Sequence, residues 1–197
     1  LIAVDDEKVL KIARKYEFKA IMTDKNHQSG TDRINEAVQN FGIKDDEIII
    51  NVQADEPFFE SENLRKFKDF AARKITSNEA FMASCYKKVS DEDAENPNLV
   101  KVVLDKFENA IYFSRAPIPY PRAEFHDYFG HIGIYAYSVK NLREFCAFAP
   151  SILENTEKLE QLRALSNAKK IAMCEIKTVS IGIDTKQDYE AALKKLI

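Results

Sequence analysis

The sequence predicts an α/β fold in which helices cover a mainly parallel sheet. Short apolar runs and helical apolar stripes alternate along most of the chain, which is typical of strands that alternate with helices. Its 197 residues are enough for one medium-sized domain with a core of its own. No internal repeat is visible. We therefore expect a single domain over residues 1–197.

Composition and charge exclude several classes of protein. With 29 basic and 32 acidic residues the net charge is −3, so no general attraction to nucleic acid or to anionic membranes is expected. No apolar run reaches the roughly 18–20 residues of a membrane span. The three cysteines are scattered, which favours a reducing compartment over a disulfide framework. We expect a cytoplasmic protein without nucleic-acid or membrane partners.

The first half of the chain predicts strands that are each followed by a helix. Residues 1–17 predict a strand that runs directly into a helix, with Asp5 or Asp6 as the N-cap. Because a strand at residue 1 needs neighbours and no methionine opens the chain, we expect an N-terminal part to be missing. The next elements are a strand at 18–23, a helix at 31–41, a strand at 47–52 and a helix at 61–74.

The second half is richer in strands. Residues 80–89 predict a strand, and residues 99–115 predict two strands joined by a turn between Asp105 and Asn109. The region of about 80–137 therefore looks like a β-rich insertion with an antiparallel element. The later elements are a strand at 131–138, a helix at 156–167, a strand at 179–184 and a helix at 185–196.

Two acidic residues follow predicted strands at their carboxyl ends. Asp55 comes after the strand at 47–52, which reads as the most buried strand in the chain, and Asp184 ends the strand at 179–184. Ligands of α/β sheets bind beyond the carboxyl ends of the strands. Mg²⁺ prefers one or two carboxylates, completed by water and phosphate oxygens. The two acids therefore predict a magnesium site, although Asp184 and Thr185 can instead cap the last helix.

The polar loop before the helix at 31–41 predicts a ligand-binding turn. Ser29 and Gly30 precede Thr31, which can cap the helix, and Arg33 projects from the first turn. A helix start offers free N–H groups and the positive end of the helix dipole. Glycine lets the backbone approach a ligand closely. The pattern favours nucleotide binding, but a simple capping turn can also produce it.

Seven motifs, taken together, resemble one enzyme family. In chain order they are HQSGTDR, NVQADEP, NPNLVKVVLD, YFSRAPIP, HIGIYAYS, LEQLRAL and GIDTKQD. Their order and spacing are similar to those of the 3-deoxy-manno-octulosonate cytidylyltransferases, over nearly the whole chain. The resemblance implies a sugar-nucleotidyltransferase-like Rossmann-type sandwich, dependence on Mg²⁺, and a homodimer built through the β-rich insertion. It also implies transfer of CMP from CTP to 3-deoxy-D-manno-octulosonate (Kdo), with release of pyrophosphate, in lipopolysaccharide biosynthesis.

The resemblance also implies roles for individual residues. It assigns the metal to Asp55 and Asp184, which would also serve catalysis. It assigns CTP to Ser29, Gly30, Arg33 and Gln53. It assigns the sugar acid to Arg115, His131, Tyr135, Glu160 and Gln161. Arginine suits the carboxylate of Kdo because its planar guanidinium can bind both oxygens.

Alternation along residues 131–138 supports a ligand-facing strand. His131, Gly133, Tyr135 and Tyr137 share one face, and the apolar residues between them share the other. Ordinary sheet packing is an equally good account of Tyr137, because aromatic residues are favoured in strands. Glu160 and Gln161 would lie on the helix at 156–167.

Two departures from the family pattern leave other functions open. The family usually opens with a strand and a loop whose arginine and lysine bind the triphosphate, and these residues do not include that segment. Ala54 also stands where a glycine is common. One alternative is a cytidylyltransferase for another sugar acid such as sialic acid, for which PTSP would be expected in place of QADEP. The other is a non-catalytic module that binds sugars or nucleotides and has lost the phosphate loop.

Overall fold

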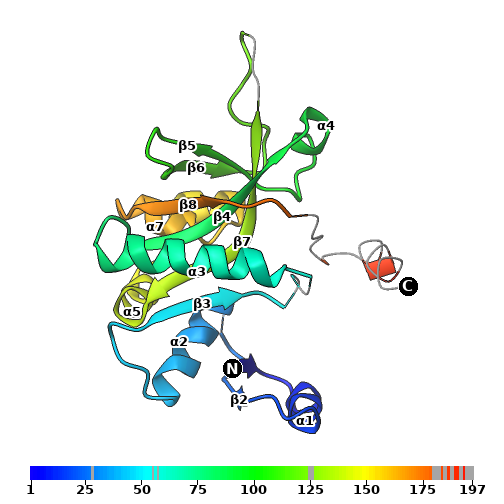
Figure 1. The fold of residues 1–197 in the computed structure, drawn as a ribbon, viewed down its shortest axis with the longest axis vertical. Helices are drawn as coiled ribbons and strands as arrows, with labels where there is room; N and C mark the ends of the chain where they lie inside the picture. The colour runs from blue at the N-terminus through cyan, green and yellow to red at the C-terminus, as the bar shows by residue number, and fades with distance from the viewer. Residues whose placement is uncertain are drawn as a thin grey trace.

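The computed structural model describes residues 1–27, 29–54, 56, 58–123 and 127–178, together with residues 183, 186, 189, 190 and 193. The strands are β1 (Ile2–Val4), β2 (Ala20–Met22), β3 (Ile48–Val52), β4 (Met82–Val89), β5 (Lys101–Leu104), β6 (Ala110–Ser114), β7 (Tyr128–Ser138) and β8 (Ile171–Glu175). The helices are α1 (Glu7–Lys15), α2 (Gly30–Asn40), α3 (Ser61–Thr76), α4 (Asp91–Ala94), α5 (Val139–Ala147), α6 (Ile152–Glu157) and α7 (Leu162–Ser166). The predicted α/β class is confirmed (Figure 1).

The described strands form one two-stranded sheet and one six-stranded sheet (Figure 1). β1 and β2 pair in parallel, and the larger sheet has the order β6-β5-β7-β4-β8, with β3 also pairing with β7. β4 and β8 are parallel, but β7 is antiparallel to β3, β4 and β5. The sheet is therefore mixed, and the predicted parallel arrangement holds for only part of it. The reason is that helix α3 joins β3 to β4, whereas β7 is reached through the β5–β6 hairpin and returns in the opposite direction.

Two apolar cores cover the two faces of the large sheet. On one face, Phe67 of α3 packs in the same cluster as Ile134 of β7. On the other face, Phe145 of α5 and Leu162 of α7 cluster with Tyr135 of β7. Alternate residues of β7 thus enter opposite cores, as its sequence predicts. Because Tyr137 is almost fully buried in the second core, sheet packing accounts for it.

The region at 80–137 does not form a separate layer. Its first and last strands, β4 and β7, are central strands of the large sheet. The predicted hairpin is present as β5 and β6, which pair antiparallel, and Asp105 accepts hydrogen bonds from the backbone of its turn. The part that stands out from the sheet core is the segment between β4 and β7 (Figure 1).

β3 is less buried than the sequence indicates. Its isoleucines are half-buried, and Val52 is 41% exposed. Among the described strands β3 pairs with β7 alone, so it lies at an edge of the sheet. An apolar run indicates burial but does not show how many neighbours a strand has.

The helix predicted at 156–167 is broken into two. Lys158 has a φ of 55°, a left-handed conformation that a right-handed helix cannot continue, and it ends α6. Buried Leu159 follows, and α7 begins at Leu162. Glu160 and Gln161 therefore lie in the turn between α6 and α7, and their predicted position on a helix is wrong.

The predicted elements at 179–184 and 185–196 fall almost entirely outside the described residues. Asp55 and Asp184 also lie outside them. Within the described part, no helix has both the length and the apolar character that a membrane crossing requires.

Candidate functional site

The polar face of β7 brings together residues that the sequence assigns to two different ligands. β3 and β7 pair antiparallel with Val52 opposite Ile134. Gln53, one residue beyond β3, lies against Gly133, where an added Cβ would be 3.7 Å from Gln53 Nε2. Gly133 lies between His131 and Tyr135 on this strand. The proposed CTP residue Gln53 therefore adjoins the proposed sugar-acid residues.

His131 is a neutral, buried histidine. Burial lowers the pKa of its imidazole to about 3. Its Nε2 lies 2.8 Å from Ser84 Oγ, which itself lies 2.8 Å from Ile134 O. Ser84 has one hydroxyl proton, and donating it to Ile134 O requires His131 Nε2 to donate to Ser84. In that arrangement Nδ1 of His131 is an acceptor. An acceptor at this position suits a hydroxyl group of a ligand better than a carboxylate of a ligand.

The turn between α6 and α7 covers the same face of β7. The Tyr135 hydroxyl donates to Gln161 Oε1 over 3.2 Å, and Gln161 is buried. The turn is held by an ion pair between the flanking helices, in which Arg163 Nη2 lies 2.5 Å from Glu154 Oε1 and Arg163 Nε lies 2.9 Å from Glu154 Oε2. Both side chains are nearly buried, so little solvent screens the pair. Gln161 is thereby fixed against Tyr135.

Glu160, the other residue of this turn, reaches the start of α2. Ser29 Oγ lies 3.3 Å from Glu160 Oε1, and the side chain of Thr31 also forms a hydrogen bond with Glu160. Burial raises the pKa of the Glu160 carboxyl, against the opposing effect of these hydrogen bonds. Ser29, proposed for CTP, and Glu160, proposed for the sugar acid, are thus neighbours.

Ser29, and not Thr31, is the N-cap of α2. Asp32 N donates to Ser29 Oγ over 3.2 Å, and Gly30 is the first residue of the helix. The hydroxyl of Thr31 is instead buried and hydrogen-bonded to Tyr137 and Glu160. Carboxylates of Asp32 and Glu160 therefore surround the helix start. An acceptor-rich site of this kind suits hydroxyl groups, such as those of a ribose or a sugar, better than it suits a phosphate.

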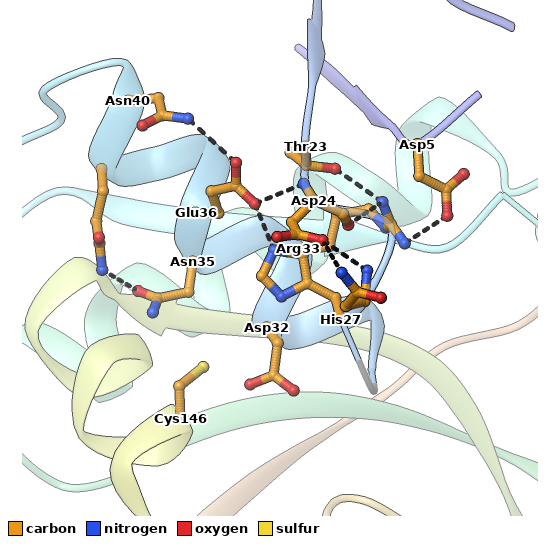
Figure 2. A network of polar contacts seen from close by, with 12 residues as sticks. Asp5, Thr23, Asp24, His27, Asp32, Arg33, Asn35, Glu36, Asn40 and Cys146 are labelled. Atoms are coloured by element: carbon orange, nitrogen blue, oxygen red, sulfur yellow. Dashed lines mark hydrogen bonds and ion pairs between the residues drawn. The ribbon is translucent and has the colours of Figure 1, made fainter. Parts of the chain in front are cut away.

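Arg33 is engaged in a network that ties α2 to the first two strands (Figure 2). Its Nη2 lies 2.7 Å from Asp5 Oδ2, just after β1, and its Nη1 donates to Thr23 Oγ1 over 2.7 Å, just after β2. Thr23 Oγ1 lies 3.0 Å from Val4 O. This arrangement shows a structural role for Arg33 and leaves its predicted contact with CTP untested.

The loop before α2 is held by Glu36 (Figure 2). Glu36 Oε2 accepts a hydrogen bond from Asp24 N over 2.9 Å and also contacts His27 Nε2. The bond from Asp24 N is the main reason why the pKa of Glu36 lies below its ordinary value. His27 belongs to the HQSGTDR motif, so the motif includes a residue that fixes the loop.

Arg115 is half-buried at the end of β6 and is fixed by backbone carbonyls. Its Nε donates to Glu157 O over 2.9 Å, and its Nη1 donates to Pro97 O over 3.0 Å. The Glu157 carboxylate accepts from the Arg115 backbone N–H over 3.0 Å and from Ser114 Oγ over 2.6 Å. The motifs NPNLVKVVLD and YFSRAPIP therefore meet at Arg115.

Known proteins are similar in sequence to this chain over nearly its whole length. The cytidylyltransferase family model matches residues 1–171. A 3-deoxy-manno-octulosonate cytidylyltransferase of Nitratiruptor sp. is 48% identical over 96% of this chain and 80% of that protein. The enzyme of the same name from Wolinella succinogenes is 49% identical over 98% of this chain and 82% of that protein.

The chain belongs to the family of 3-deoxy-manno-octulosonate cytidylyltransferases. The resemblance inferred from the seven motifs is thereby confirmed. A solved structure, CMP:2-keto-3-deoxy-manno-octonic acid synthetase complexed with CTP, superposes with a TM-score of 0.88 at 34% identity, covering 98% of this chain and 79% of that chain. The overall fold is therefore that of the cytidylyltransferase.

Two buried polar residues of this cytidylyltransferase were missed by the sequence reasoning. Ser84 holds His131 from the neighbouring strand β4. Lys101 is fully buried in β5, and its ammonium group donates to Asn96 O and Arg115 O. A charged residue inside the apolar run LVKVVL was the available signal for Lys101. The sequence carries no comparable signal for Ser84.

The metal site of the cytidylyltransferase remains a prediction. Among the described residues, no group of three or more His, Cys, Asp or Glu side chains could hold a metal ion. Asp55 and Asp184, the predicted ligands, lie outside those residues.

A cleft of about 630 Å³ lies elsewhere, at the amino ends of β4 and β8, with Lys74, Phe81 and Lys169 among its lining residues. None of the predicted site residues lines it, so its size alone does not make it the active site.

Proposed function

We propose that this protein transfers CMP from CTP to the anomeric hydroxyl of Kdo, giving CMP-Kdo and pyrophosphate for lipopolysaccharide biosynthesis in the cytoplasm. The observation that carries the proposal is the 48–49% identity to enzymes of that name over nearly the whole chain. The structure supports it with a contact between a predicted CTP residue, Ser29, and a predicted sugar-acid residue, Glu160. Gln53, also predicted for CTP, lies beside Gly133, which stands between His131 and Tyr135 on β7.

The residues around β7 account for recognition of a hydroxylated acid. Tyr135, Gln161 and Glu160 supply acceptors and donors for sugar hydroxyls, and they are held rigid by buried hydrogen bonds. Neutral His131 can accept a hydrogen bond without carrying charge. Arg115 supplies the cation for the carboxylate of Kdo.

The reaction needs no covalent enzyme intermediate. The anomeric oxygen of Kdo bonds to the α-phosphorus of CTP, the bond from that phosphorus to the β-phosphate oxygen breaks, and pyrophosphate leaves. Catalysis of this kind depends on holding the two substrates in line. The short links between the CTP side and the sugar side would serve that purpose.

We also propose that Asp55 and Asp184 hold Mg²⁺. Their place after two strands predicted from the sequence and their hard carboxylate oxygens fit this ion. Bound Mg²⁺ would neutralise charge on the phosphates and lower the pKa of the attacking hydroxyl.

A homodimer through the β5–β6 hairpin region belongs to the same proposal. Ile111 on β6 is 57% exposed, Tyr120 beyond it is 82% exposed, and Phe107 in the hairpin turn is also exposed. Exposed apolar side chains on the hairpin and beyond it favour a protein interface in this region. Ile111→Asp should therefore yield a monomer in sedimentation velocity, whereas Ile152→Asp, at an exposed position on α6, should not change the mass.

One assay tests the activity. The protein as its gene encodes it is mixed with CTP and Mg²⁺, and pyrophosphate release is compared for Kdo, sialic acid and no acceptor. Release with Kdo alone supports the proposal. Release with sialic acid would make the protein a cytidylyltransferase for another sugar acid, and CTP binding without release would make it a binding module.

A further inference from the structure

Lys101 is a charged residue in the interior of the sheet. Its exposed fraction is 0%, and burial lowers the pKa of its ammonium group. Its Nζ donates to Arg115 O over 2.6 Å and to Asn96 O over 2.9 Å. Within the described part of the chain, no carboxylate lies within ion-pair distance of it. Burial of an ammonium group without a counter-ion is unfavourable, so the presence of a lysine at this buried position needs an explanation.

The contacts of Lys101 fix the backbone of Arg115. The Arg115 carbonyl accepts from Lys101, and the Arg115 N–H donates to Glu157 Oε2. Arg115 Nη1 donates to Pro97 O, next to the second Lys101 acceptor, Asn96 O. Lys101 and Arg115 thus bind the same short turn from two sides, and this turn sets the direction of the guanidinium.

Lys101 also links Arg115 to His131. In the sheet Lys101 lies opposite Gly130, and His131 N donates to Val100 O over 2.7 Å. On the other side Lys101 lies opposite Ser114, next to Arg115. Val100 and Lys101, at the start of β5, therefore fix the spacing of two residues proposed to bind the sugar acid.

We propose that Lys101 is a positioning residue for the sugar-acid site, because its ammonium group ties the Arg115 carbonyl to the turn that orients the Arg115 guanidinium. The expected change in KM for Kdo rests on the proposed function. The structural consequence, a fixed Arg115 side chain, does not depend on that function.

An apolar side chain could fill the same space. Methionine matches lysine in length and would avoid the cost of burying a charge, so Lys101→Met need not destabilise the fold. It would remove both hydrogen bonds and release the Arg115 carbonyl. Lys87 offers a control, since it lies opposite Gly130 on the other side, in β4, and among the described contacts it bonds to neither Asn96 nor Arg115.

The kinetic test compares Lys101→Met with Lys87→Met. Hydrogen bonds from charged groups contribute enough that their loss changes affinity by about tenfold or more. We expect Lys101→Met to raise KM for Kdo by about tenfold while KM for CTP stays within about twofold, and Lys87→Met to change neither. Unchanged KM for Kdo, or equal losses for both substrates, would overturn the proposal.

A second measurement is independent of activity. The side-chain Nε–H signal of Arg115 is assigned in a ¹H–¹⁵N spectrum by its loss in Arg115→Lys. Because this N–H donates to Glu157 O, we expect slow exchange with water in the unsubstituted protein and faster exchange in Lys101→Met. An unchanged signal would overturn the positioning role. If the unsubstituted protein shows no transfer to Kdo while this signal responds, the proposed function fails and the positioning role stands.

A folding defect does not end the test. Lys101→Gln has an uncharged side chain whose nitrogen is one bond closer to the backbone than Nζ, so it should not reach both carbonyls, and both measurements are repeated on it if Lys101→Met is unfolded by circular dichroism. A rise of KM for Kdo, together with faster exchange of the Arg115 signal, supports the proposal. Normal values of both would overturn it.

Discussion

Ser29 Oγ lies 3.3 Å from Glu160 Oε1, although the two residues are 131 positions apart in the chain. One belongs to the cap of α2, and the other to the turn between α6 and α7. The contact places a residue proposed for CTP against one proposed for Kdo. A nucleotidyl transfer requires such a short link between its two substrate sites.

Glu160→Gln tests whether the buried carboxylate of Glu160 lowers the stability of the folded protein. Burial raises the pKa of Glu160 above its ordinary value of 4.5, so the unfolded chain loses this proton more readily. The protonated Glu160 carboxyl stabilises the folded state below about pH 4.5. This stabilisation is lost as the pH rises through the pKa of Glu160 in the folded protein. We expect Glu160→Gln to have the higher Tm at pH 7, with the difference vanishing near pH 4.5, and to have a raised KM for Kdo.

Thermal unfolding at both pH values measures the first effect. Asp69→Asn, at an exposed position in the middle of α3, should leave Tm unchanged. A lower Tm of Glu160→Gln at pH 7 would mean that the bonds from Ser29 and Thr31 outweigh the burial of the charge.

Arg115→Lys should weaken Kdo binding far more than CTP binding. Lysine lacks the fork that donates to Glu157 O and Pro97 O and that matches a carboxylate. We expect KM for Kdo to rise by about tenfold or more, as for the loss of a charged hydrogen bond. Steady-state kinetics with each substrate varied will show it, with exposed Arg65→Lys as control. Equal effects on both substrates would place Arg115 on the phosphates or in the core.

Arg33 can be a nucleotide contact, a structural clamp, or both, and two substitutions separate these roles. Asp5→Asn removes its ion-pair partner, and Arg33→Met removes the guanidinium itself. We expect each to lower the free energy of unfolding by about 1 kcal/mol, since the pair is partly exposed. If Arg33 binds CTP, only Arg33→Met weakens CTP binding in calorimetric titration. Equal CTP affinities in the two variants would leave Arg33 as a clamp alone.

The buried pair of Glu154 and Arg163 should matter more for stability than an exposed pair of the same length. Arg163→Met leaves the Glu154 carboxylate without its partner, and we expect it to lower the free energy of unfolding by about 3–5 kcal/mol. Arg143→Met breaks the exposed pair with Asp45 and should cost at most about 1 kcal/mol. Urea denaturation compares them. Similar values would show that solvent reaches the Glu154–Arg163 pair.

Asp55→Asn and Asp184→Asn should each remove most activity without unfolding the protein. Loss of a metal carboxylate costs several kcal/mol of transition-state stabilisation, which corresponds to a fall in kcat of at least about 100-fold. Pyrophosphate release is measured over a range of Mg²⁺ concentrations. Near-normal turnover of Asp184→Asn at low Mg²⁺ would make Asp184 a helix cap only.

The sequence by itself determined many of the local elements and the family, although it did not predict α5 or β8 and placed one helix where α6 and α7 are separated by a turn. Strict alternation from His131 to Tyr137 predicted which side chains share each face of the strand, and the structure confirms it, with the two sets in opposite cores. The turn between Asp105 and Asn109 was also predicted, as was an N-cap at Asp5 or Asp6, which the structure places at Asp6, because each depends on hydrogen bonds within a few residues. The order of seven short motifs was enough to identify the family.

Only the tertiary structure decided which of these elements meet and which residues they hold. Lys101 reads as an odd charge in an apolar strand until Arg115 O and Asn96 O are seen to bind it. Ser29 reads as a loop residue before a cap at Thr31, and Glu160 reads as a residue on a helix, until the two loops are seen to touch. Periodicity reports the environment of a side chain along one element, whereas a hydrogen bond between elements depends on how they pack. That packing is fixed by the whole core, and no short stretch of this sequence encodes it.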